Sequence, residues 1–101
     1  MLKEIYSILG TGSCYIKDGA IAESYLLDEK ELNYIEEIAK VTPKLPEKFI
    51  MGFFEHEEGK AIVVKHGKGF ICIPVRSDNV MSELRKVEVE VYDKILSPQN
   101  K

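Results

Sequence analysis

The sequence predicts a single α+β domain, in which helices flank both faces of a five-stranded, mainly antiparallel sheet in the order α-β-β-α-β-β-β-α. Two observations predict this class. Segments with apolar residues at helical spacing alternate with shorter, strand-like apolar runs, and glycine or proline turns separate them. The 101 residues also contain no repeat, low-complexity tract or long linker. We therefore assign residues 1–101 to one domain, with 97–101 as a frayed tail.

The N-terminal part is expected to form a helix followed by a hairpin. Residues 2–9 carry apolar side chains at helical spacing, and Gly10 is a typical helix terminator. Residues 13–17 and 20–27 are strand-like. Asp18-Gly19 between them is a strong hairpin signal, because both central residues of such a turn adopt positive φ angles.

A second helix is expected to begin after Asp28. This residue is a suitable N-cap, and Glu31 three positions later can complete a capping box. Pro43 and Pro46 cannot continue a helix, so we place its end near residue 41.

Three strands and one ambiguous element complete the chain. The strands are expected at Phe49–Phe54, Ala61–Lys65 and Phe70–Val75, joined by polar turns. In the last element, apolar residues alternate with acids from Val87 to Val91, as in a strand. Helical spacing covers a longer window and predicts a helix capped by Ser77 or Asp78. Its apolar positions are Val80, Leu84, Val87, Val91 and Ile95.

The composition excludes several classes of function. The chain has 14 basic and 17 acidic residues, and a net charge of −3 argues against general binding of nucleic acid. No apolar run approaches the roughly 18–20 residues that span a membrane. Cys14 and Cys72 lie in strand-like surroundings without metal-ligand spacing, which favours a reduced, cytoplasmic protein.

Three groups of residues could carry chemistry, and each has a simpler interpretation. The segment His66–Gly69 could bind phosphate, but a hairpin turn between strands explains its glycines better. His56 could bind a metal, but no second histidine stands at ligand spacing, and a solvated turn is the better interpretation. Cys14 and Cys72 fit small buried hydrophobes. We therefore expect no catalytic, cofactor-binding or metal-binding residue, and no enzymatic activity.

Surplus apolar surface instead predicts an interface between two copies of the chain. In the second helix, Tyr34, Ile38 and Val41 form a stripe beside the one that would face a sheet. The strand after this helix is apolar on both faces and has no charge or proline to protect an edge. Its interface residues are Phe49, Ile50, Met51, Phe53 and Phe54. The alternative is that the loop Thr42–Lys48 covers the stripe.

Nearly the whole chain, to about Leu96, resembles the Roadblock (dynein light-chain) family. The segment Lys17–Ser24 is similar to the family's hairpin, in which Asp-Gly precedes an apolar-x-Ala/Ser strand. Ile73-Pro74-Val75, followed by Asp78-Asn79-Val80, looks like the family's last strand running into its final helix. The order and spacing of the elements add to these motifs.

The resemblance implies a fold and a function. It implies a sheet ordered 2-1-5-4-3, with the first and last helices on one face and the middle helix on the other. It also implies a homodimer formed through the second helix and third strand. Such a protein is a non-enzymatic scaffold or regulatory module that binds a small Ras-like GTPase, or a motor or signalling subunit, and modulates it. The alternative is a small-ligand sensor of the profilin-like or PAS-like sort, which would need an apolar cavity with convergent polar groups.

Overall fold

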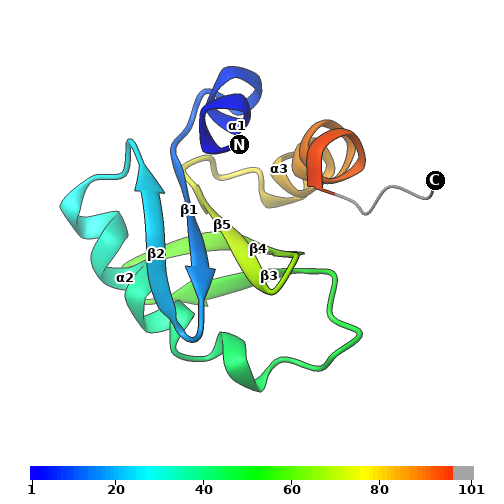
Figure 1. Ribbon diagram of the computed structural model, residues 1–101. Coiled ribbons are helices and arrows are strands. Elements are labelled where there is room, and N and C mark those ends of the chain that lie inside the picture. Colours follow the sequence, from blue (N-terminus) through cyan, green and yellow to red (C-terminus); the bar gives the residue numbers. More distant parts are fainter. Residues whose placement is uncertain (97–101) are drawn as a thin grey trace.

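A computed structural model describes residues 1–96, and the frayed tail expected at 97–101 lies outside the described residues. It shows three layers, with a sheet between helices (Figure 1). The elements are α1 (Leu2–Leu9), β1 (Ser13–Lys17), β2 (Ala20–Tyr25), α2 (Glu29–Ala39), η1 (Thr42–Lys44), β3 (Met51–His56), β4 (Gly59–His66), β5 (Gly69–Val75), α3 (Val80–Lys86) and η2 (Val87–Leu96). The expected α+β class and order of elements are confirmed.

Local signals position the N-terminal elements as expected. Gly10 ends α1 with a left-handed φ of 74°. Asp18 and Gly19 form the turn between β1 and β2 with φ angles of 54° and 78°. β2 ends at Tyr25, two residues earlier than expected, and Leu26 beyond it has a φ of 53°.

α2 begins with the expected capping box. The Asp28 carboxylate accepts a hydrogen bond from the Glu31 backbone N–H, and the Glu31 side chain accepts one from the Asp28 N–H. The helix ends at Ala39. A short 3-10 helix, η1, begins at Thr42 and contains Pro43 as its second residue. The Thr42 hydroxyl donates to the Ala39 carbonyl over 2.8 Å, which ties this turn to the end of α2.

The sheet has five strands in the order β2-β1-β5-β4-β3, and all neighbours are antiparallel. The Roadblock resemblance implies the same order. α1 and α3 lie on one face of the sheet and α2 lies on the other (Figure 1). A shared topology defines a fold and does not by itself define a function.

Two hydrophobic clusters fill the spaces between the layers. On one face, α1 and η2 pack on alternate residues of β4 and β5. This cluster consists of Leu2, Ile5, Ile62, Val64, Ile71, Ile73, Val75, Val87, Val91 and Leu96. On the other face, α2 packs against β1, β4 and β5. This cluster consists of Cys14, Ile16, Tyr34, Ile35, Ile38, Ala39, Ala61, Val63 and Cys72. Each strand thus contributes to both cores, because successive side chains point to opposite faces.

The ambiguous last element is a helix, as the longer window predicted. Its cap is Asn79, whose side chain accepts from the Ser82 N–H over 3.0 Å, and not Ser77 or Asp78. From Val87 the helix continues as a π-helix.

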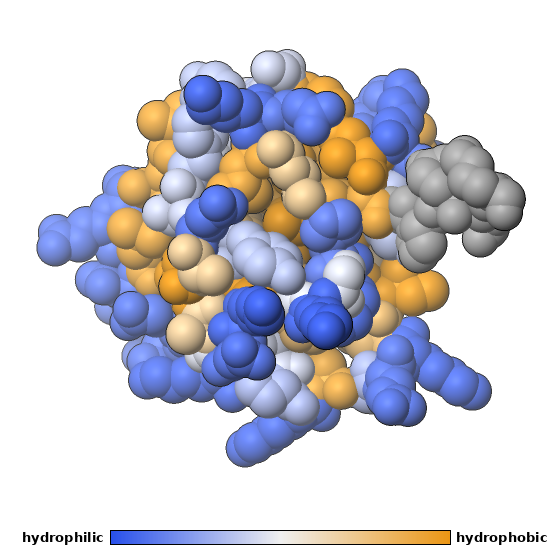
Figure 2. Space-filling view, viewed as in Figure 1, coloured by the Kyte–Doolittle hydropathy of each residue, from blue (hydrophilic) through white to orange (hydrophobic). Residues whose placement is uncertain are grey.

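The surface of the molecule is mixed in polarity. Figure 2 shows hydrophilic side chains that project around the outline of the molecule, with hydrophobic residues between them.

Candidate functional site

β3 forms one edge of the sheet, and among residues 1–96 half of its backbone groups have no strand to pair with. The Ile50 carbonyl accepts a hydrogen bond from the Lys65 N–H over 2.8 Å, so residue 50 points its backbone groups toward β4. The backbone N–H and C=O groups of successive residues alternate in direction along an antiparallel strand, so those of Gly52 and Phe54 also point toward β4. The N–H and C=O groups of Met51, Phe53 and Glu55 therefore point away from the sheet.

The side chains of β3 other than Glu55, which is exposed, are half-buried, and they lie on both faces. Met51 and Phe53 pack against the cluster under η2, and Phe54 packs against the cluster under α2. Phe49 precedes the strand and folds back over Gly52, where an added Cβ would lie 2.9 Å from its ring. The strand begins at Met51 and not at Phe49 as expected, because the Phe49 N–H bonds to the Pro46 carbonyl in a turn.

Of the eight residues expected at an interface, two are strongly exposed. Ile50 is 54% exposed and Val41 is 46% exposed. They lie before β3 and after α2, respectively. These two side chains and the edge of β3 are available to a second copy of the chain.

The expected apolar surplus on α2 is largely absent. Tyr34 and Ile38 are both 5% exposed and belong to the core between α2 and the sheet. Their burial is explained within one chain, so the interpretation of their stripe as surplus was wrong. α2 therefore buries a wider apolar face against the sheet than its sequence predicted.

Gly59 explains how Tyr34 reaches this position. A Cβ at Gly59 would overlap the Tyr34 ring, so the glycine leaves space for it. The Tyr34 hydroxyl donates to the Lys60 carbonyl over 2.9 Å, and its ring stacks on His56 at 6.1 Å between centroids. No local pattern in the sequence predicted this contact between Gly59 and Tyr34.

An ion pair that no sequence pattern predicted joins the first turn of α2 to the residue that follows β5. Arg76 donates to both oxygens of the Glu31 carboxylate, over 2.6 and 2.7 Å. The Glu31 side chain is 9% exposed, while that of Arg76 is 51% exposed. These two hydrogen bonds to Glu31 raise the pKa of Arg76 above its ordinary value. Burial, and then the negative charge of Glu31, raise the pKa of the neighbouring Tyr34 phenol.

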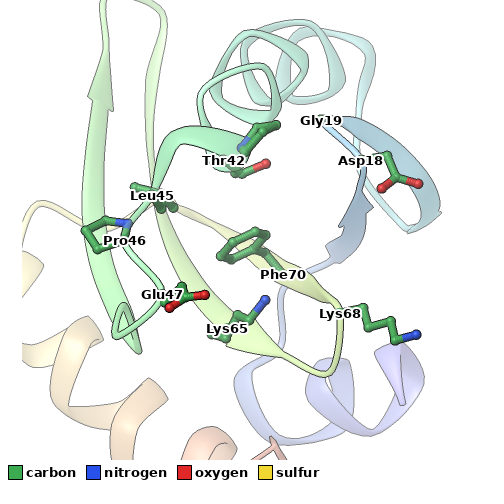
Figure 3. Close-up of a pocket in the computed structure, with 10 residues that line it drawn as sticks. Asp18, Gly19, Thr42, Leu45, Pro46, Glu47, Lys65, Lys68 and Phe70 are labelled. Carbon is green, nitrogen blue, oxygen red and sulfur yellow. The ribbon is translucent and has the colours of Figure 1, made fainter.

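A hollow of about 460 Å³ lies at the end of the sheet that carries the β1–β2 and β4–β5 turns (Figure 3). Phe70 lines it, and the Lys65 ammonium lies 4.8 Å from the centre of its ring. Lys68 lines the same hollow together with Asp18 and Glu47, so charges of both signs surround it. β4 ends at His66 and β5 begins at Gly69, which confirms the expected hairpin turn between them.

Residues 1–96 contain no group of three histidine, cysteine, aspartate or glutamate side chains that could hold a metal ion. His56 instead accepts a hydrogen bond from the Glu58 N–H at its Nδ1 atom. Within the same described range, none of the helices is long and apolar enough to cross a membrane.

The fold and this site define a class: an α+β domain with helices on both faces of its sheet and an open, half-apolar edge. No protein-family model matches the chain. It is 72% identical over 98 residues to an uncharacterized protein of the archaeon Archaeoglobus fulgidus, in an alignment that covers 97% of this chain and 100% of the other. The chain therefore belongs to the same family as that archaeal protein.

Proposed function

We propose that the protein is a non-enzymatic, cytoplasmic homodimer of the Roadblock type that binds and modulates a small Ras-like GTPase. The observation that carries the dimer is the open edge of β3, with its outward-pointing backbone groups between half-buried apolar side chains. The GTPase as partner rests on the family resemblance.

In the proposed dimer, two β3 strands pair antiparallel across a two-fold axis at Phe53. The outward groups of Phe53 then meet those of the same residue, and the groups of Met51 meet those of Glu55 in the second copy. This register uses all three outward-pointing residues of each strand. It joins two five-stranded sheets into one continuous sheet.

The charges near β3 favour an antiparallel arrangement. Lys48 lies before the strand, and Glu57 and Glu58 form the turn after it. Antiparallel pairing brings the start of one strand beside the end of the other, so opposite charges meet on both sides of the axis. The dimer would also cover the side chain of Ile50, which is half exposed in the single chain. Its burial contributes roughly 1 kcal/mol per copy to the free energy of association.

The opposite helix layer would remain available to the GTPase. α1, α3 and η2 lie on the face away from α2, and several apolar side chains project from this layer into solvent. They include Tyr6, Ile8, Met81 and Val89. A contiguous apolar patch is typical of a surface that binds another protein, so these side chains are the candidates for such a contact.

The dimer is tested by blocking the strand edge at an exposed position. Glu55→Pro removes an outward-pointing N–H and leaves the bonds between β3 and β4 in place, and Glu55→Ala is the matched control. In size exclusion with light scattering, we expect the native chain and Glu55→Ala at twice 11.5 kDa, and Glu55→Pro at 11.5 kDa. Circular dichroism checks that both variants are folded.

A second variant keeps this test decisive if the proline disturbs folding. Ile50→Glu places a charge at the exposed end of the strand, and Val89→Glu, on η2, is its control at similar exposure. A native chain that elutes as a monomer at micromolar concentration contradicts the dimer. So does a dimer that Ile50→Glu and Val89→Glu leave equally intact.

The partner is tested separately, by capture from the native cell extract on the immobilised chain. We expect a small GTPase among the retained proteins, and no GTP hydrolysis by the purified chain alone. Retention of a metabolite without a protein would favour the alternative, a small-ligand sensor. The hollow beside Phe70 is the observation that favours that alternative.

A further inference from the structure

The pairing of β1 with β5 holds the two halves of the sheet together. β1 and β2 form one hairpin, while β3, β4 and β5 form a meander, and in the described residues the strand order connects them at this one seam. The seam consists of three residue pairs: Cys14 with Cys72, Tyr15 with Ile71 and Ile16 with Phe70. It is also the pairing between strands most distant in sequence.

Both cysteines of the chain face each other in this seam. Cys14 and Cys72 are directly opposite in the register, and both side chains are fully buried in the cluster under α2. The Cα atoms of directly opposite residues in antiparallel strands lie about 4.5 or 5.5 Å apart. Both values fall within the approximately 4.4–6.8 Å that a disulfide spans. The two thiols are unbridged in this structure.

We propose that Cys14 and Cys72 form a cross-strand dithiol that a low-molecular-weight disulfide oxidises to an intramolecular disulfide, locking β1 to β5. One thiolate attacks the small disulfide, forms a mixed disulfide and releases one small thiolate. The second cysteine thiolate then attacks the protein sulfur of the mixed disulfide and releases the other small thiolate. Two protein thiols are oxidised, the small disulfide is reduced to two thiols, and the two cysteine protons pass to them.

The surrounding packing controls when this exchange can occur. A hydrogen bond with Cys14, followed by burial, raises the pKa of Cys72, which disfavours its reactive thiolate form. Ile35 and Ile38 of α2 belong to the cluster that encloses the pair. Exchange therefore requires α2 to open, and the Arg76–Glu31 ion pair opposes that opening.

The cross-link is tested on the full chain with oxidised glutathione as the probe. After exposure, the chain is denatured so that both buried cysteines become accessible, and maleimide labelling and mass spectrometry then count the remaining thiols. We expect a monomer-length chain with neither thiol labelled and a mass lower by two hydrogen atoms. A cross-link that closes so long a loop should raise the melting midpoint by roughly 10 °C or more. Dithiothreitol should reverse both changes.

Cys14→Ala and Cys72→Ala are the controls, because neither can form the intramolecular bond. We expect no rise of the melting midpoint in either variant. Two thiols that still label after long exposure of the native chain contradict the proposal. A glutathione adduct that persists on one cysteine contradicts it as well.

The role of α2 is tested by the rate of oxidation. Arg76→Ala removes the ion pair at the start of α2, and Lys94→Ala removes an exposed ion pair with Glu90 on η2. We expect several-fold faster cross-linking in Arg76→Ala and an unchanged rate in Lys94→Ala. Equal rates in the two variants contradict control by α2.

Discussion

Tyr34 is a single residue that links three parts of the molecule. Its ring fills the space left by Gly59, its hydroxyl bonds to the Lys60 carbonyl, and its backbone belongs to α2. The helix is thereby attached to the start of β4, close to the proposed dimer edge. Burial keeps the phenol neutral to higher pH than in an unfolded chain, where its pKa is about 10.

This residue predicts a specific pH dependence. At neutral pH, Tyr34→Phe should lower the free energy of unfolding by about 1 kcal/mol, since a part-buried hydrogen bond is lost. The raised pKa of Tyr34 means that its stabilising contribution is complete below pH 10 or so and declines above it, as the unfolded state ionises first. The difference between native chain and variant should therefore shrink in alkali. Urea unfolding from pH 7 to 11 measures it, and a constant difference contradicts this account.

At the scale of an element, the C-terminal helix shows how a π-helical segment fits the core. Its buried residues Val87, Val91 and Leu96 are spaced by four and then five positions. Hydrogen bonds from i to i+5 widen the turn, which allows this spacing to keep one side toward the sheet. Ile95, expected on the buried face from the α-helical period, is half-buried, and Leu96 takes the buried position.

The start of this element gives a prediction about its cap. Asn79→Ala should lower the free energy of unfolding by about 1 kcal/mol, because the Ser82 N–H loses its acceptor. Asp78→Ala is the matched control and should cost much less, since Asn79 alone supplies the cap to this helix. Parallel chemical unfolding of both variants measures the difference. A larger loss in Asp78→Ala contradicts the assignment of the cap.

At the scale of the whole molecule, the arrangement of charge is more informative than the net value of −3. The end of the sheet with the β1–β2 and β4–β5 turns carries Lys17, Lys65 and Lys68 beside the acidic Asp18 and Glu47. The opposite end carries the acidic β3–β4 turn and the acidic first turn of α2. Two copies that pair antiparallel through β3 place these ends side by side, and Lys48 of one copy then lies near the acidic β3–β4 turn of the other, so the charges beside the proposed seam are complementary.

A charge exchange tests this arrangement. Lys48→Glu and Glu58→Lys should each weaken the dimer, and the double variant should recover much of the loss because opposite charges meet again across the axis. Sedimentation equilibrium at low salt measures the dissociation constants, and high salt should reduce the differences. A double variant weaker than both single variants contradicts the antiparallel arrangement.

The elements that the sequence predicted correctly depend on local chemistry. The Asp18-Gly19 turn, the capping box of Asp28 and Glu31, and the glycine that ends α1 each act within a few residues. Such signals are decided by the allowed φ angles and by hydrogen bonds to nearby backbone groups. They are present in the sequence whatever the rest of the chain does.

The tertiary structure decided how wide a face α2 buries and which distant residues meet. It placed Tyr34 and Ile38 in the core, Arg76 on Glu31, and Cys14 opposite Cys72. None of these contacts has a local signal, because each depends on the strand order and on the register between strands far apart in sequence. Register and order follow from the packing of both cores at once, and that packing exists only in the folded chain.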